Sequence, residues 1–265
     1  MVSLVELAEL VFSKILSWRR SLPYNILAYS LYKSIWAGLD LVFPPVCGGC
    51  EKIGSRWCEE CQQRVQVLRG TLCEVCGLPL EGANICNSCL ADKPHFRALR
   101  AWAVYDDPVK RALHKLKYRR DIALGDALAE YMAPFVRGLD WYVDMIVPIP
   151  LGRQRYKDRG YNQVGMIARP LSLALGVRFA PKMLIRRKET RTQVGLTRQE
   201  RLENVREAFE VGTEARGKSI LVLDDVSTTG ATLSSSAKAL YSSGAKDVFA
   251  LTVARALPHH DLRQV

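Results

Sequence analysis

Hydrophobic residues follow two different spacings along this 265-residue chain. In the first 46 residues they recur every three or four positions, which predicts helices that break near Pro23. From Phe96 onward, short apolar runs alternate with stretches of helical spacing. The apolar runs predict strands at 98–105, 145–149, 219–223 and 247–254.

Helical spacing returns between these strands. The expected helices cover 109–118, 122–136, 162–175 and 231–243. Gly176 and Gly244 follow the last two, at the position where a left-handed residue commonly ends a helix. The run at 219–223 lacks the alternation of a half-exposed strand, so we expect it to be buried on both faces. Strands that alternate with helices predict an α/β fold, a parallel sheet flanked by helices.

The composition is that of a soluble protein, with 48% hydrophobic and 25% charged residues. No apolar stretch approaches the ~20 residues of a membrane span, and Glu6 and Glu9 stand where a signal peptide needs basic residues. We therefore expect a cytoplasmic protein without a transmembrane segment. Two alternatives stay open for the N-terminal helices. They pack on the protein or a partner, or they lie on the inner membrane surface through Phe12, Ile15 and Trp18.

Positive charge is concentrated in the second half of the chain. The formal net charge is +11, and residues 150–206 alone hold fourteen Lys and Arg against four acids. A second basic cluster, 109–120, has six Lys and Arg and no acid. Charge of this kind favours polyanionic ligands such as nucleic acids or phosphorylated compounds. The alternative is a solvated basic face.

All eight cysteines fall in four Cys-x2-Cys pairs within one short block. The pairs are Cys47/Cys50, Cys58/Cys61, Cys73/Cys76 and Cys86/Cys89. Two such pairs supply four thiolates for a tetrahedral zinc ion, so we expect about two zinc ions. Disulfides are the alternative, and the missing secretion signal argues against them. A thioredoxin-like motif accounts for one pair only.

The order in which the cysteines share metals stays open at this point. Consecutive quartets are favoured because the loops between their pairs are short, seven and nine residues. A cross-braced arrangement, in which alternate pairs share a metal, is the other possibility. Neither leaves an open coordination position, so the metals are structural and supply folding energy.

A candidate phosphate site occupies residues 220–232. There a buried strand ends in two acids, and a loop of hydroxyl residues and glycine leads into a helix. Free amides at a helix N-terminus bind phosphate, and paired acids accept hydrogen bonds from vicinal ribose hydroxyls. The candidate residues are Asp224, Asp225, Ser227, Thr228, Thr229, Gly230, Ala231 and Thr232. The glycine patterns of dinucleotide sites and P-loops are absent, and a plain strand–turn–helix is the alternative.

Residues 224–232 resemble the signature of type I phosphoribosyltransferases. Together with the cysteine block and the segment Arg159-Gly-Tyr-Asn-Gln163, they resemble the ComF family of bacterial competence proteins. The resemblance extends over about 43–255 and includes 115–118, 147–150 and 204–209. The first forty residues match nothing in this family pattern.

This resemblance implies a type I phosphoribosyltransferase-like parallel sheet with an N-terminal double zinc ribbon. It also implies a pocket for phosphoribosyl diphosphate (PRPP) with Mg²⁺ at the carboxyl edge of the sheet, covered by a hood at 187–200. Candidates for contacts to diphosphate or DNA are Arg153, Lys157, Arg159, Asn162, Gln163, Arg187, Lys188, Arg191 and Arg198. Catalysis in such enzymes is mostly positioning and charge neutralisation, so the catalytic residues stay unassigned.

The resemblance further implies an accessory protein of DNA uptake and natural transformation. It would bind PRPP and single-stranded DNA, with a DNA-uptake helicase or membrane machinery as partners. Two alternatives stay open: an active phosphoribosyltransferase on an unidentified base or amine, and a PRPP-responsive regulator. The sequence reveals no acceptor-recognition loop, and a family's fold does not establish turnover.

The expected domains are a helical extension at 1–46, a zinc ribbon module at 47–93, a phosphoribosyltransferase-like domain at 94–257 and a tail at 258–265. With the module as a separate unit, replacement of Cys73 and Cys76 is expected to disorder it and to leave the transferase-like domain folded.

Overall fold

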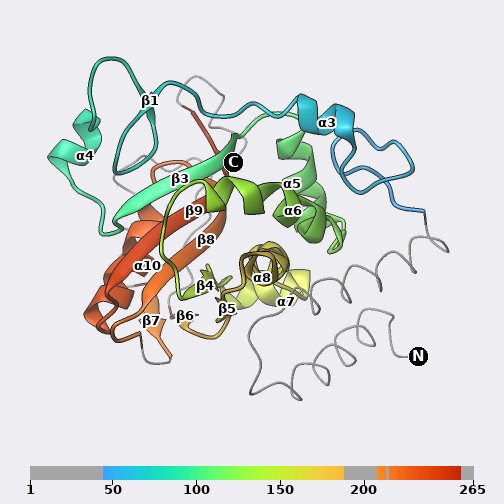
Figure 1. Ribbon diagram of the computed structural model, residues 1–265. Helices are drawn as coiled ribbons and strands as arrows, with labels where there is room; N and C mark the ends of the chain where they lie inside the picture. Colours follow the sequence, from blue (N-terminus) through green and yellow to red (C-terminus); the bar gives the residue numbers. More distant parts are fainter. Residues whose placement is uncertain (1–43, 188–207, 213–214, 258–265) are drawn as a thin grey trace.

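The computed structural model describes residues 44–187, 208–212 and 215–257 (Figure 1). The helices predicted in the first 43 residues, nearly all of the predicted hood and the C-terminal tail lie outside the described residues.

Five parallel strands form the central sheet. In spatial order they are β3 (Ala98–Val104), β9 (Asp247–Arg255), β8 (Ser219–Ser227), β4 (Met145–Pro148) and β5 (Arg178–Phe179). The parallel α/β architecture predicted from the alternating elements is therefore confirmed. The sequence does not predict β5, because two residues are too few to show a periodicity.

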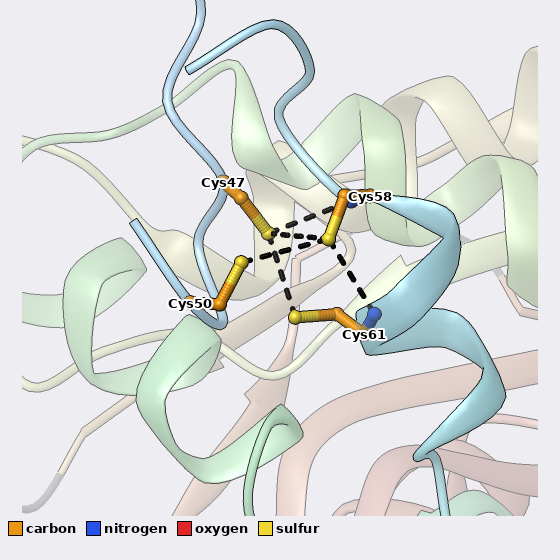
Figure 2. Close-up of side chains that lie close together, drawn as sticks. All are labelled: Cys47, Cys50, Cys58 and Cys61. Atoms are coloured by element: carbon orange, nitrogen blue, oxygen red, sulfur yellow. Dashed lines mark hydrogen bonds between the residues drawn. The ribbon is translucent and has the colours of Figure 1, made fainter. Parts of the chain in front are cut away.

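The cysteine-rich segment lies along β3, the edge strand of the sheet (Figure 1). Its elements are α3 (Glu59–Gln63), β1 (Thr71–Leu72), β2 (Pro79–Leu80) and α4 (Asn87–Ala91). Its first four cysteines converge on one point (Figure 2). The Leu99 amide donates to the Val75 carbonyl and the Val104 amide to the Gln66 carbonyl, each over 2.7 Å. These bonds occupy the open edge of β3, which would otherwise offer unpaired backbone groups.

Both faces of the sheet are buried. Leu221 and Leu223 of β8 join one hydrophobic cluster, whereas Ile220 and Val222 join the cluster on the opposite face. Burial on both sides of β8, predicted from its unbroken apolar run, is therefore confirmed.

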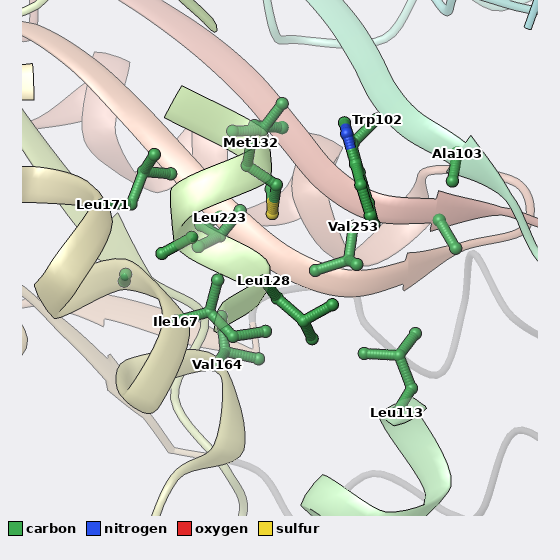
Figure 3. Close-up of a cluster of buried hydrophobic side chains, with 14 of the residues drawn as sticks. Trp102, Ala103, Leu113, Leu128, Met132, Val164, Ile167, Leu171, Leu223 and Val253 are labelled. Atoms are coloured by element: carbon green, nitrogen blue, oxygen red, sulfur yellow. The ribbon is translucent and has the colours of Figure 1, made fainter. Parts of the chain in front are cut away.

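Helices cover each face. On the first face lie α5 (Val109–Tyr118), α6 (Leu124–Arg137) and α8 (Gln163–Leu175), and on the second lies α10 (Ala231–Ser242). Figure 3 shows Leu128 of α6 and Ile167 of α8 gathered with Leu223 of β8. Gly176 ends α8 in the left-handed conformation, with φ of 71°, as the sequence predicts.

Outside the cysteine-rich segment, three further described elements are not predicted from the sequence. They are the helix α7 (Arg153–Arg159) and the antiparallel strands β6 (Leu184–Arg186) and β7 (Phe209–Val211). α7 has no buried residue, so no apolar stripe marks it. β6 and β7 are each three residues long and pair across the undescribed segment 188–207, a distance that local patterns do not reach.

Candidate functional site

A cavity of about 430 Å³ opens at the carboxyl ends of β4 and β8. From β4 the chain passes through α8 to β5 on one side, whereas from β8 it passes through α10 to β9 on the other. The connections therefore diverge between these two neighbouring strands. In open α/β sheets such a topological switch point is where ligands bind. The predicted phosphate loop and acid pair both line this cavity.

The loop between β8 and α10 presents amides and hydroxyls to the cavity. Thr228, Thr229 and Thr232 line it, and Gly230 forms the N-cap of α10 with φ of 79°. A residue with a side chain is strained in this left-handed conformation, so the turn favours glycine. The Thr229 hydroxyl accepts a hydrogen bond from the Ala231 amide over 3.3 Å. A helix N-terminus thus joins threonine hydroxyls at one wall, an arrangement that suits phosphate.

The strand before this loop is longer than the sequence predicts. β8 continues past Leu223 through both acids to Ser227, which pairs with Arg255 of β9. The prediction that the strand ends at the acids is therefore wrong, because β9 supplies backbone partners that extend the ladder. Ser227 borders the cavity, but its buried hydroxyl accepts a hydrogen bond from Arg255 Nη1 over 3.1 Å.

The second acid of the pair is held by the protein itself. Asp225 is 7% exposed, and its Oδ2 accepts hydrogen bonds from Lys117 Nζ at 3.0 Å and Gln163 Nε2 at 2.9 Å. Its Oδ1 accepts another from the Val226 amide at 2.7 Å. Burial raises the pKa of Asp225, but the Lys117 charge and these hydrogen bonds outweigh it and lower the pKa. Asp225 is therefore a buried, ionised carboxylate.

The first acid has different surroundings. Asp224 lines the cavity, and its Oδ1 accepts a hydrogen bond from the Asp225 amide at 2.9 Å. Burial, followed by the negative charge of Asp225, raises the pKa of Asp224 to about 7. Folding therefore places an easily protonated carboxyl beside one that stays charged.

We expect Asp224→Asn to stabilise the ligand-free protein at pH 8. The carboxyl ionises near pH 4 in the unfolded chain, whereas its pKa in the folded protein is about 7. Wild-type stability therefore falls as the pH rises between these values, and an amide removes this loss. Denaturant unfolding should show a gain of about 1–3 kcal/mol at pH 8 that disappears toward pH 4. Equal unfolding free energies at pH 8 would contradict the raised pKa.

Two residues predicted to contact diphosphate or DNA, Arg159 and Gln163, line the cavity. The Arg159 guanidinium donates to Gln163 Oε1 and lies 5.5 Å from the centre of the Tyr118 ring. Gln163 in turn donates to Asp225, so its side chain orients the acid. Arg159 is thus the better placed of the two for direct contact with an anionic ligand.

The other predicted contact residues have different positions. Asn162 caps α8, because its side-chain oxygen accepts hydrogen bonds from the first amides of that helix. Arg153 and Lys157 are exposed on α7 and are not part of the cavity lining. Arg187 pairs with Glu210 of β7. Three candidates lie outside the described residues: Lys188, Arg191 and Arg198.

Further cations line the cavity that the sequence does not single out as ligand contacts. They are Lys117, Arg120, Arg155 and Arg186. The Lys117 side chain is 21% exposed and pairs with Asp225, so its charge is neutralised in the cavity wall. Helical spacing carries a signal for this position, because Lys117 follows the buried Leu113 by four residues on α5. Lys115 also has an acidic partner, the exposed Glu51, at 3.1 Å.

The cysteine sulfurs gather into two tetrads whose members all lie within 4.8 Å of one another. The tetrads are Cys47, Cys50, Cys58 and Cys61, and Cys73, Cys76, Cys86 and Cys89. Sulfurs are 3.6 Å apart between Cys47 and Cys61 and 3.7 Å apart between Cys76 and Cys86. Four sulfurs at about 2.3 Å from a tetrahedral zinc ion stand about 3.8 Å apart. The donor sets fit zinc, and the consecutive arrangement is confirmed.

Backbone amides donate hydrogen bonds to sulfurs of both tetrads. The Cys58 amide donates to Cys47 Sγ and the Cys86 amide to Cys73 Sγ, each over 3.4 Å (Figure 2 shows the first). Burial raises the pKa of both thiols, but hydrogen bonds from amides outweigh it and lower the pKa to about 6 for Cys47 and about 7 for Cys73. In each tetrad one cysteine therefore favours the thiolate, which is the form that binds metal, whereas burial raises the pKa of Cys61 and Cys89.

Known proteins match most of this chain. The DNA utilization protein YhgH of Escherichia coli O6:H1 is 31% identical over 228 residues, which cover 82% of this chain and 100% of that protein. Competence protein F of Haemophilus influenzae is 28% identical over 208 residues, covering 75% and 90%. Competence protein ComFC of Bacillus subtilis is 28% identical over 228 residues, covering 83% and 89%. The chain belongs to the ComF family.

This ComF protein also matches a family described as the double zinc ribbon domain, over residues 38–90, which contain both tetrads. Similar solved structures include a purine phosphoribosyltransferase from Pyrococcus horikoshii, with 19% identity, a TM-score of 0.31 and coverage of 49% of this chain and 81% of that chain. The strand order of the sheet and membership of the ComF family define the fold. The protein combines a type I phosphoribosyltransferase-like sheet with an N-terminal double zinc ribbon. No helix in its described part is long and apolar enough to cross a membrane.

Proposed function

We propose that this ComF protein acts in DNA uptake and natural transformation and binds PRPP in the cavity between β4 and β8. The observation that carries the proposal is the meeting of an acid pair with a threonine-rich helix N-terminus at the switch point of the sheet. Relatives named for competence and for DNA utilization support the biological setting.

Each part of PRPP has a matching group in the cavity. The 5′-phosphate fits the amides and hydroxyls of 228–232, and the ribose hydroxyls fit the carboxyl of Asp224. Asp225, fixed by Lys117, orders the backbone that carries Asp224. The cations that line the cavity and suit the diphosphate are Arg120, Arg155, Arg159 and Arg186. Mg²⁺ would enter with the diphosphate as part of the ligand.

Mg²⁺–PRPP is expected to stabilise the wild-type protein by roughly 2.7 kcal/mol at about 100 times its dissociation constant. Thermal unfolding with and without ligand compares the wild type, Asp224→Asn and the matched control Asp247→Asn. Asp247 is the first residue of β9, so it lies at the amino ends of the parallel strands, whereas the cavity lies at their carboxyl ends. We expect the shift to be lost in Asp224→Asn and kept in the control. Equal shifts in all three proteins would exclude a contact between Asp224 and the ligand. Absence of a shift in the wild type would overturn PRPP binding.

Consumption of PRPP depends on an acceptor that displaces diphosphate at the anomeric carbon. The cavity offers positioning groups and cations for such a step, which needs no nucleophilic triad. A diphosphate-release assay over a panel of bases and amines therefore separates an active phosphoribosyltransferase from a PRPP-responsive binding protein.

We propose that α7 contributes to a surface for single-stranded DNA. Arg153 and Lys157 are exposed on this helix, and Tyr156 beside them is 53% exposed. Cations follow a phosphate backbone, and exposed aromatic rings stack on bases without strong sequence preference.

Arg153→Ala combined with Lys157→Ala is expected to weaken binding of a fluorescent oligothymidine. Each lost phosphate contact should reduce the slope of log affinity against log salt by about 0.7. The control, Lys238→Ala with Lys246→Ala, removes equal charge from exposed positions on α10 and just before β9. Affinity and slope unchanged by the α7 pair, or changed as much by the control pair, would remove α7 from the DNA surface.

For the cysteines we propose one structural zinc ion in each tetrad. The segment 47–93 then serves as a clasp on the edge of the transferase-like domain at 94–257, because it bonds to β3 and joins both hydrophobic clusters.

A further inference from the structure

A buried arginine lies between the second cysteine tetrad and the phosphate loop. Arg255 is the last residue of β9 and is 5% exposed. Its Nη1 donates to the Ser227 hydroxyl at 3.1 Å, and its guanidinium interacts electrostatically with the sulfur of Cys76. Within the described part of the chain, its Nε has no hydrogen-bond partner. One side chain therefore contacts two sites that the sequence presents as separate.

The second tetrad has a physical need for such a cation. A zinc ion with four thiolates carries a net charge of −2, and all four of these cysteines are buried. Buried charge is costly unless it is paired or hydrogen-bonded. Arg255 interacts electrostatically with Cys76, Cys86 and Cys89. In the first tetrad, by contrast, Cys50 and Cys58 are only half-buried, so water solvates part of the negative charge.

The other end of Arg255 reaches the ligand loop. Ser227 immediately precedes the threonine-rich turn, and its register partner in the sheet is Arg255. When the tetrad holds its metal, the guanidinium is held between a thiolate and the Ser227 hydroxyl. The start of the loop is then ordered before a ligand arrives, which reduces the ordering cost of binding.

We propose that Arg255 is a positioning residue that couples the second zinc site to the phosphate loop. Metal in the tetrad strengthens ligand binding at the loop, and by thermodynamic reciprocity a loop ligand slows loss of that metal. The ligand half of this proposal rests on the proposed PRPP function. The metal half concerns Arg255 and the tetrad alone.

Zinc transfer from the full-length protein to a coloured chelator tests the metal half. Polar partners of ligating groups typically contribute 10–100-fold to metal affinity. Arg255→Met is therefore expected to release one of the two zinc ions about tenfold faster and the other at the wild-type rate. Arg255→Lys, which keeps the charge, should stay closer to the wild type. Arg255→Gln, which also removes the charge, replaces the Met variant if the latter does not fold, and unchanged release in the neutral variant would overturn the proposal.

Titration with Mg²⁺–PRPP tests the ligand half. We expect Arg255→Met and Ser227→Ala to bind about 5–10-fold more weakly than the wild type, because each removes one partner of the Arg255–Ser227 hydrogen bond. Arg100→Met is the matched control, since Arg100 donates to the Cys73 and Glu74 carbonyls beside the same tetrad. It should alter zinc release and leave PRPP affinity within about twofold.

The coupling itself is read from zinc release with PRPP present. In the wild type, ligand should slow release of the zinc ion whose loss Arg255→Met accelerates. It should have no effect on zinc release in Ser227→Ala. Equal slowing in both proteins, or PRPP binding without any slowing, would overturn the coupling and leave the proposed function intact. Absence of PRPP binding in the wild type would overturn the proposed function and the ligand half together, while zinc release without ligand still decides the metal half.

Discussion

Removal of metal from the two tetrads is expected to unfold the sheet domain together with the cysteine module. Cys47 and Cys61 belong to the same hydrophobic cluster as Leu113 and Leu128, and the second tetrad shares a cluster with Leu99. Structural zinc contributes about 10–16 kcal/mol in isolated zinc fingers, which matches or exceeds the usual 5–15 kcal/mol stability of a whole domain. This shared packing predicts a single unfolding unit, whereas the sequence alone favours a transferase-like domain that stays folded without the module.

Two tryptophans make the outcome measurable. Trp57 lies beside α3 in the cysteine module and Trp102 lies in β3, with ring centres 6.4 Å apart. We expect chelator titration to give one transition in tryptophan fluorescence and far-UV circular dichroism, starting from about two zinc ions per chain. Excess zinc added with the chelator is the control. A Cys73→Ser/Cys76→Ser protein that retains native circular dichroism and thermal stability would show that the two units fold independently.

Lys117→Met is expected to destabilise the protein by about 3–5 kcal/mol, because it leaves the buried Asp225 carboxylate without its cation. Asp225→Asn added to this variant should recover much of the loss, since the uncompensated charge is then gone. The lowered pKa of Asp225 means that the pair stabilises the fold above about pH 4, and that this contribution is lost as the pH falls further.

Denaturant unfolding at pH 7 measures these differences. The control is Arg111→Met on the same helix, whose partner Asp107 is partly exposed and whose loss should cost at most about 1 kcal/mol. If Lys117→Met and Arg111→Met have the same small effect, the Lys117–Asp225 pair does not organise the cavity.

Local patterns predict the long elements of this fold well. α5 spans the predicted interval, and α8 ends at Gly176 as expected, because a 3.6-residue apolar period and a left-handed glycine are properties of a continuous segment. Local patterns do not predict α7 or the β6–β7 pair. The helix buries nothing, and the two strands are specified by each other across a long connection.

The candidate site divides in the same way. The cysteine pairs and the turn at Gly230 can be identified from the sequence, since metal knuckles and phosphate loops are made by residues a few positions apart. The extension of β8 through Ser227 is different, because the backbone partners in β9 exist only once the sheet has formed.

The sequence by itself determined the chemistry of this protein: paired thiolates, a phosphate-binding turn, two adjacent acids and an excess of positive charge. Tertiary structure alone decided how these groups are used. It pairs Lys117 with Asp225, raises the pKa of Asp224, and sets Arg255 between Cys76 and Ser227. The physical reason is that Lys117 and Arg255 find their partners in other segments of the chain, and that burial, which raises the pKa of Asp224, exists only in the folded protein. Strand order, register and burial bring them together, and none of these is written in the spacing of neighbouring residues.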